Sequence, residues 1–121
     1  MPALVIKTNA TFTKEEKSAA MKDFVDIISV QQQKPVNSIM IIFEDNTSIR
    51  IAGSEENAAF VKINAVGGVN NENNKKVAKG ITDWFVSHGI PANRIYLVFS
   101  DKNPENWSTN GLLVSDLIAN K

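Results

Sequence analysis

The sequence predicts an α+β fold, an α/β sandwich in which a four-stranded main sheet carries two helices on one face. The first observation is an internal repeat, because KPVNSIMIIFED (34–45) and IPANRIYLVFSD (90–101) align without a gap at an offset of 56 residues. The second is a helical pattern ahead of each of these segments. Each half therefore has the order strand, helix, strand, over about 2–45 and 58–101. We expect the whole chain, 1–121, to form a single domain.

The opening strand begins at Pro2, and the same offset gives it a twin in AAFVKINAV (58–66). Thr13 with Glu16 forms a capping box at the start of the first helix, and Gly89 is a left-handed stop after the second. Between the strands, apolar residues recur at steps of three and four, the period of one helix face. They are Met21, Phe24, Val25 and Ile28 in the first half, and Val77, Ile81, Trp84 and Phe85 in the second.

Two helices cover only one face of the sheet, so the other face needs a further partner. A second or third copy of the protein is the simplest partner. The short apolar segments TSIRIAG (47–53) and NWSTNGLLVSDLIANK (106–121) look like edge pieces that extend a neighbour's sheet. We therefore expect 102–121 to be a C-terminal interface or tail segment of a homo-oligomer.

Composition argues against several classes of function. Lys plus Arg and Asp plus Glu are equal at 13 each, so the chain lacks the basic footprint of a nucleic-acid-binding protein. The absence of cysteine excludes disulfides and thiolate sites, and a lone His88 argues against a histidine-based metal site or catalytic triad. No stretch approaches the ~18 apolar residues of a membrane span, and the N-terminus lacks the pattern of a signal peptide. We expect a cytoplasmic protein with no metal, no nucleic acid and no membrane insertion.

Pro2 is the first candidate for chemistry, since removal of Met1 would leave it as a free secondary amine on a rigid strand. The plain alternative is a small second residue that simply permits methionine removal. Burial or nearby positive charge would lower the pKa of this amine and make it a general base near neutral pH. Lys34 is the second candidate, because strand adjacency would bring its ammonium beside Pro2, where it could also bind a substrate carboxylate. Its alternative role is to complement a helix C-terminus.

Two aromatic residues each leave a structural and a functional interpretation open. Tyr96 stands where the first repeat carries Met40, and a tyrosine on a strand is typical of half-buried packing with a solvated hydroxyl. Trp107 lies in the late, turn-rich stretch NWSTNG (106–111). An aromatic residue there either caps a pocket or seals a subunit contact.

Several short motifs follow one another along the chain: MPALVIKTNA at 1–10, KP at 34–35, GS at 53–54, AVGG at 65–68, RIYLVFSD at 94–101 and NWSTNG at 106–111. In this order and spacing they resemble the macrophage migration inhibitory factor family of the tautomerase superfamily. The match runs over nearly the whole chain, from Pro2 to about Gly111. The resemblance implies a homotrimer of subunits that each contain a β-α-β pseudo-repeat, in agreement with the repeat and the uncovered sheet face.

The resemblance also implies a function and residue roles. A free Pro2 looks like the catalytic base of a cofactor-independent keto-enol tautomerase, an isomerase. Lys34, the backbone of Val66 and Trp107 would bind the substrate, and Tyr96 would enter the same pocket from the adjacent subunit. Members of this family interconvert the keto and enol forms of phenylpyruvate-like aromatic acids and of D-dopachrome analogues, without a cofactor or metal.

The family resemblance leaves a second function open, that of a cytokine-like signalling protein. In that case the chain would be secreted without a signal peptide and would bind a host or self receptor at the cell surface, with weak or no catalysis. The end of the chain departs from the family pattern, because Leu112 and Leu113 follow Gly111 where relatives usually supply an aromatic residue that walls the pocket. We expect aromatic substrates to be held differently as a result.

Overall fold

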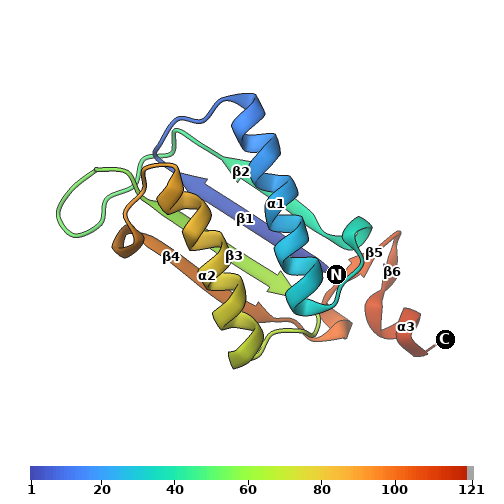
Figure 1. Ribbon diagram of the computed structural model, residues 1–121. Helices are drawn as coiled ribbons and strands as arrows, with labels where there is room; N and C mark the ends of the chain where they lie inside the picture. The colour runs from blue at the N-terminus through green and yellow to red at the C-terminus, as the bar shows by residue number, and fades with distance from the viewer. Residues whose placement is uncertain (120–121) are drawn as a thin grey trace.

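The computed structural model describes residues 1–119, which form a mixed four-stranded sheet with two long helices on one face (Figure 1). This architecture confirms the predicted α+β fold, and the strand order is β2-β1-β3-β4. The elements are β1 (Pro2–Thr8), α1 (Lys14–Gln32), β2 (Met40–Glu44), β3 (Ala59–Ala65), α2 (Asn71–Ser87), β4 (Ile95–Asp101), β5 (Ser108–Thr109), β6 (Leu112–Leu113) and α3 (Val114–Ala119), with 3-10 turns at Val36–Ser38, Ala92–Arg94 and Pro104–Asn106.

The sheet joins two β-α-β units. β1 runs parallel to β2 and β3 runs parallel to β4, whereas β1 and β3 are antiparallel neighbours at the centre. The register places Pro2 opposite Ala65, and Ala65 opposite Asp101. The start of β1 therefore lies at the same end of the sheet as the ends of β3 and β4.

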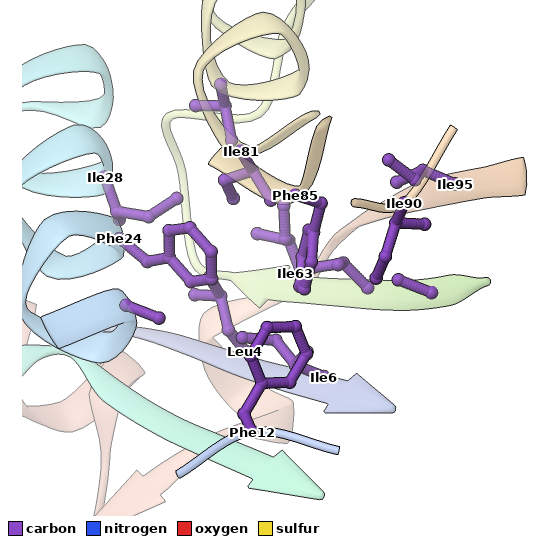
Figure 2. Close-up of a cluster of buried hydrophobic side chains, with 14 of the residues drawn as sticks. Leu4, Ile6, Phe12, Phe24, Ile28, Ile63, Ile81, Phe85, Ile90 and Ile95 are labelled. Carbon is purple, nitrogen blue, oxygen red and sulfur yellow. The ribbon is translucent and has the colours of Figure 1, made fainter. Parts of the chain in front are cut away.

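The hydrophobic core lies between the sheet and the two long helices (Figure 2). Alternate residues of the central strands are buried there, and each helix buries one apolar stripe, as the sequence period predicts. The labelled side chains in Figure 2 are Leu4, Ile6, Phe12, Phe24, Ile28, Ile63, Ile81, Phe85, Ile90 and Ile95. Full burial of one such side chain stabilises the fold by about 1.5–3 kcal/mol, so this layer holds the two units together.

Both long helices are fixed by local capping. The Glu16 backbone N–H donates to the Thr13 hydroxyl at 3.0 Å, and the Thr13 N–H donates to the Glu16 carboxylate at 2.8 Å, which completes the predicted capping box. The Asn70 side chain accepts a bond of 2.9 Å from the Asn73 N–H and caps α2. Gly89 has a φ of 90°, so the predicted left-handed stop after α2 is confirmed.

Two segments that we expected as edge pieces take a different form. Residues 47–53 contribute only an isolated bridge between Ile51 and Ser54 and no strand. In the second segment, β5 and β6 form a small hairpin, but Val114–Ala119 is helix α3, so the strand expectation is wrong there. A helix suits this part because apolar residues at steps of three and four share one helix face. Residues 120–121 of this segment lie outside the described residues.

The face of the sheet away from the helices is open in the single chain. Met40 and Ile42 on β2 are 61% and 42% exposed, and Tyr96 and Val98 on β4 are 59% and 41% exposed. Large apolar side chains on both outer strands are the reason to expect a partner on this face. None of the helices in the described part of the chain is long and apolar enough to cross a membrane.

Arg94 is a buried cation that the sequence patterns did not single out. It is 7% exposed. Its guanidinium donates hydrogen bonds to the carbonyl oxygens of Ile51 (3.0 Å), Ser54 (3.3 Å), Glu56 (2.8 Å) and Asn57 (2.9 Å). A planar guanidinium can serve several acceptors because it presents its N–H donors in a fixed fork. The loop between β2 and β3 is therefore wrapped around Arg94 instead of forming an edge strand.

Replacing Arg94 should loosen this loop. We expect Arg94→Met to lower the free energy of unfolding by about 2–4 kcal/mol, because it removes charge-assisted hydrogen bonds to four carbonyl groups. Arg94→Lys should recover only part of the loss, since one ammonium cannot reproduce the fork. Denaturant unfolding of the three proteins measures both effects. A methionine variant as stable as the unmodified protein would show that these bonds contribute nothing net.

Candidate active site

The start of β1, the turn after α1 and the end of β3 meet at one end of the sheet. Pro2 is fully buried and pairs with Ala65. The Lys34 ammonium donates a hydrogen bond of 2.7 Å to the carbonyl oxygen of Val66, the residue that follows β3. Three residues that the sequence analysis assigned to one site therefore lie together at this end: Pro2, Lys34 and Val66.

The local structure at the end of α1 fixes the backbone of Lys34. The helix is capped by Gln33, whose left-handed φ of 55° turns the chain out of the helix. The Lys34 N–H donates to the Ser29 carbonyl at 3.1 Å, and the Ser29 hydroxyl donates to the Lys34 carbonyl at 2.6 Å. Pro35 then restricts the next φ. The backbone position from which the Lys34 side chain extends to Val66 is therefore fixed.

The turn after Val66 is built from two glycines. Gly67 and Gly68 have φ values of 78° and 81°, in the left-handed region that side chains disfavour. The Gly67 N–H donates to the Asp101 carboxylate at 3.1 Å. A Cβ atom on Gly68 would lie 3.0 Å from the Cβ of Gln32. This close approach packs the turn against the end of α1 and keeps the Val66 carbonyl within reach of Lys34.

A cavity of about 280 Å³ opens at this place. Its lining residues are Met1, Lys34, Pro35, Val66, Val114, Leu117 and Ile118. Lys34 supplies the one charged side chain of this lining, and the rest is apolar. Such a cavity suits a small organic acid whose carboxylate meets the ammonium and whose apolar part meets the walls. Within residues 1–119, no group of three or more His, Cys, Asp or Glu side chains is placed to hold a metal ion.

The N-terminal amine shares the environment of this cavity. Burial lowers the pKa of the Met1 α-amino group, and the positive charge of Lys34 lowers it further. Both effects disfavour the protonated amine. An amine at this place is therefore unprotonated in a larger fraction of molecules at neutral pH than it would be in water.

Tyr96 lies at the opposite end of the sheet within one subunit. It pairs with Phe60, which pairs with Lys7, whereas Pro2 pairs across β3 with Asp101. Five residues of strand separate the two ends, or about 16 Å at ~3.3 Å per residue. Tyr96 borders a different cavity of about 150 Å³, together with Ile49, Arg50, Ile51, Ala58, Ala59, Phe60 and Arg94. A single subunit therefore does not bring Tyr96 to Lys34.

Trp107 is half-buried and is not among the residues that line the Lys34 cavity. Its carbonyl oxygen accepts a hydrogen bond of 2.9 Å from the N–H of Val114, the first residue of α3. In the single chain, the contact between Trp107 and this site is thus indirect and runs through the backbone of α3.

The sequence analysis missed the contribution of α3. Val114, Leu117 and Ile118 line the cavity, although we had expected this segment to extend a neighbour's sheet. Their spacing of three and four is a helical signal. One turn and a half of helix is too short for this signal to be decisive, since such a helix forms only where tertiary contacts hold it.

The Gly68 turn gives a direct test of how the site is built. We expect Gly68→Ala to lower the free energy of unfolding by about 2–3 kcal/mol, because it adds a clash with Gln32 to the cost of a left-handed alanine. Gly53→Ala is the matched control, since Gly53 has a similar φ of 76° but open space where its Cβ would lie. Thermal or denaturant unfolding compares the two variants. Equal losses would show that Gln32 does not crowd the turn.

The chain matches the family model described as macrophage migration inhibitory factor over residues 1–115. Macrophage migration inhibitory factor of Xenopus tropicalis is 26% identical over 112 residues, which cover 92% of this chain and 96% of that protein. A homolog from Trichuris trichiura is 27% identical over 115 residues, covering 92% of this chain and 97% of that protein.

Solved structures agree with these sequence matches. The macrophage migration inhibitory factor of Toxoplasma gondii has a TM-score of 0.86 at 26% identity, over 92% of this chain and 98% of that one. The homologue from Prochlorococcus marinus shares the fold, with a TM-score of 0.86 at 19% identity over 93% and 98% of the two chains. The family match spans both β-α-β units and the Lys34 site between them, and the chain belongs to the macrophage migration inhibitory factor family.

Proposed function

We propose that this protein is a cofactor-independent keto-enol tautomerase that acts on phenylpyruvate-like 2-oxo acids, with Pro2 as its base. The observation that carries the proposal is the Lys34 ammonium, bound to the Val66 carbonyl at 2.7 Å in the cavity that the N-terminus enters. The cavity offers a fixed cation for the carboxylate of a small acid and apolar walls for its side chain. An acid bound in this way would have its reacting C–H group beside the N-terminal nitrogen, which can act as the base. Membership of the family supports the same activity.

The reaction needs Pro2 at the N-terminus. While Met1 is attached, the Pro2 nitrogen is an amide without basicity; removal of Met1 makes it a secondary amine. The neutral amine takes a proton from C3 of the 2-oxo acid, the C–H electron pair forms the C2=C3 bond, and the carbonyl electron pair moves to oxygen. The protonated Pro2 amine then returns its proton to that oxygen, directly or through water, which completes the enol and restores the neutral base, and the same steps run in reverse. Lys34 holds the carboxylate throughout.

The environment of the N-terminus favours a neutral amine. The causes that lower the pKa of the Met1 amine are burial and the charge of Lys34. Pro2 is fully buried at the start of β1, so its nitrogen would experience both causes once Met1 is removed. The proline ring also fixes the direction of the nitrogen lone pair relative to the strand. We therefore propose that Pro2 is a base near neutral pH.

A second copy of the chain would complete the site. Tyr96 is 59% exposed at the far end of its own sheet, so its ring is free to enter the cavity of a neighbour. The open sheet face offers an apolar surface for this contact. We propose a homotrimer in which each cavity combines Pro2, Lys34 and Val66 of one subunit with Tyr96 of the next.

The base is tested by Pro2→Gly, with intact mass spectrometry to show that Met1 has been removed. We expect kcat for phenylpyruvate tautomerisation to fall by roughly 10²–10⁴-fold, the usual contribution of a positioned base. Ala3→Gly is the matched control, because it changes the next residue of the same strand and leaves Pro2 intact. Undiminished turnover by Pro2→Gly would rule out this mechanism. Receptor binding that survives Pro2→Gly, in a protein without turnover, would favour the signalling alternative instead.

The charge of Lys34 should affect how kcat/KM depends on pH. Only the unprotonated Pro2 amine is active, so kcat/KM rises with pH through the pKa of this amine. Lys34→Gln removes a positive charge that lowers this pKa, so the rising limb should move to higher pH, and KM should rise. Lys79→Gln, which removes an exposed charge on α2, should leave the limb in place. A limb that moves to lower pH or stays fixed in Lys34→Gln would contradict this role.

A further inference from the structure

Helix α3 contributes three apolar side chains to the Lys34 cavity. Val114 is buried, Leu117 is half-buried and Ile118 is 54% exposed, and all three are lining residues. In Figure 1 the helix lies at the same end of the sheet as the N-terminus. The sequence suggested only an interface or tail in this part of the chain, and α3 instead supplies an aliphatic wall of the candidate active site.

The position of α3 is set by its own attachments. The Val114 N–H donates to the Trp107 carbonyl at 2.9 Å. The hairpin of β5 and β6 precedes it, and its turn uses left-handed Asn110 and Gly111 with φ values of 54° and 75°. α3 also packs against the 3-10 turn Pro104–Asn106. The wall is therefore held by backbone structure and does not depend on the cavity being filled.

A second hollow adjoins the Lys34 cavity. It has a volume of about 440 Å³ and is lined by Val66, Gly67, Asp101, Lys102, Asn103, Pro104 and Ile118. Val66 and Ile118 line both hollows. The two hollows therefore adjoin at Val66 and Ile118, and Ile118 is the residue of α3 that borders both.

We infer that α3 is the specificity-determining wall of the proposed tautomerase site, and that Leu117 limits the size of the substrate side chain. The inference rests on the proposed function. With the carboxylate held at Lys34, the group on C3 must project onto the apolar lining, where α3 supplies three of the side chains. The cavity of about 280 Å³ is small for a ligand site. Removal of Met1 enlarges it and entry of a neighbour's Tyr96 reduces it, so we expect it to suit a 2-oxo acid with one compact apolar group, up to a single ring.

The test compares a one-ring and a two-ring substrate, phenylpyruvate and indole-3-pyruvate. Leu117→Ala should raise kcat/KM for the two-ring acid relative to the one-ring acid by about tenfold, mostly through KM, because removing most of the leucine side chain enlarges the Lys34 cavity. Leu117→Trp should change this ratio in the opposite direction. Leu112→Ala is the matched control, since this exposed leucine on β6 lines neither hollow and should leave the ratio unchanged. Circular dichroism and size-exclusion chromatography verify that each variant is folded and assembled.

Binding separates a failure of this inference from a failure of the proposed function. 3-Phenylpropanoate and indole-3-propanoate have no keto group and cannot react, and NMR titration gives their affinities for each variant. A change in their affinity ratio in Leu117→Ala without any turnover would support the wall and reject the tautomerase. The inference would be overturned if, in both Leu117 variants, the two-ring to one-ring ratio stays unchanged for affinity and for kcat/KM. A parallel loss for both ligands would also overturn it, because it would assign Leu117 a purely structural role.

Discussion

The Lys34 ammonium donates a hydrogen bond of 2.7 Å to the Val66 carbonyl, and this contact joins the first β-α-β unit to the turn between β3 and α2 in the second. Two features of the backbone make this contact possible. The left-handed end of α1 aims the lysine, and the glycine turn holds the carbonyl close enough to accept. The bond also holds a positive charge near the N-terminus, where burial already disfavours a protonated amine. One contact therefore links the packing of the two units to the chemistry proposed for Pro2.

The internal repeat builds the scaffold, but only one half of it carries this chemistry. The offset of 56 residues takes Pro2 to Ala58 and Lys34 to Ile90. Ile90 is 1% exposed and packs in the core, so the second unit has an apolar residue where the first has its cation. Ala58 borders the other cavity, with Tyr96 at its edge. The two ends of the sheet are thus equivalent in fold but carry different residues, which suits the proposed site that takes its tyrosine from a neighbouring copy.

The sequence predicted the features that depend on long or strictly local patterns. The internal repeat predicted the four strands, and the spacing of apolar residues predicted both long helices. Short-range signals predicted the capping box at Thr13 and the left-handed residue Gly89 that ends α2. Features that depend on distant contacts were not predictable. Arg94 finds its acceptors in a loop without a pattern, and α3 is too short to form without the surface it packs on. Pro2, Lys34 and Val66 could be grouped in advance because strand order brings them together, whereas the separation of Tyr96 from them required the register of the sheet.

The central claim is that this fold turns the Pro2 nitrogen into a base, and the pKa of that nitrogen tests it most directly. Protein that lacks Met1 and carries ¹⁵N-labelled proline can be titrated by NMR, since among its four prolines only Pro2 would have an ionisable nitrogen. We expect a pKa clearly below that of proline in an unfolded peptide, because burial and Lys34 both disfavour the protonated form. An unshifted or raised pKa would contradict the account, because the amine would then be protonated and inert at neutral pH.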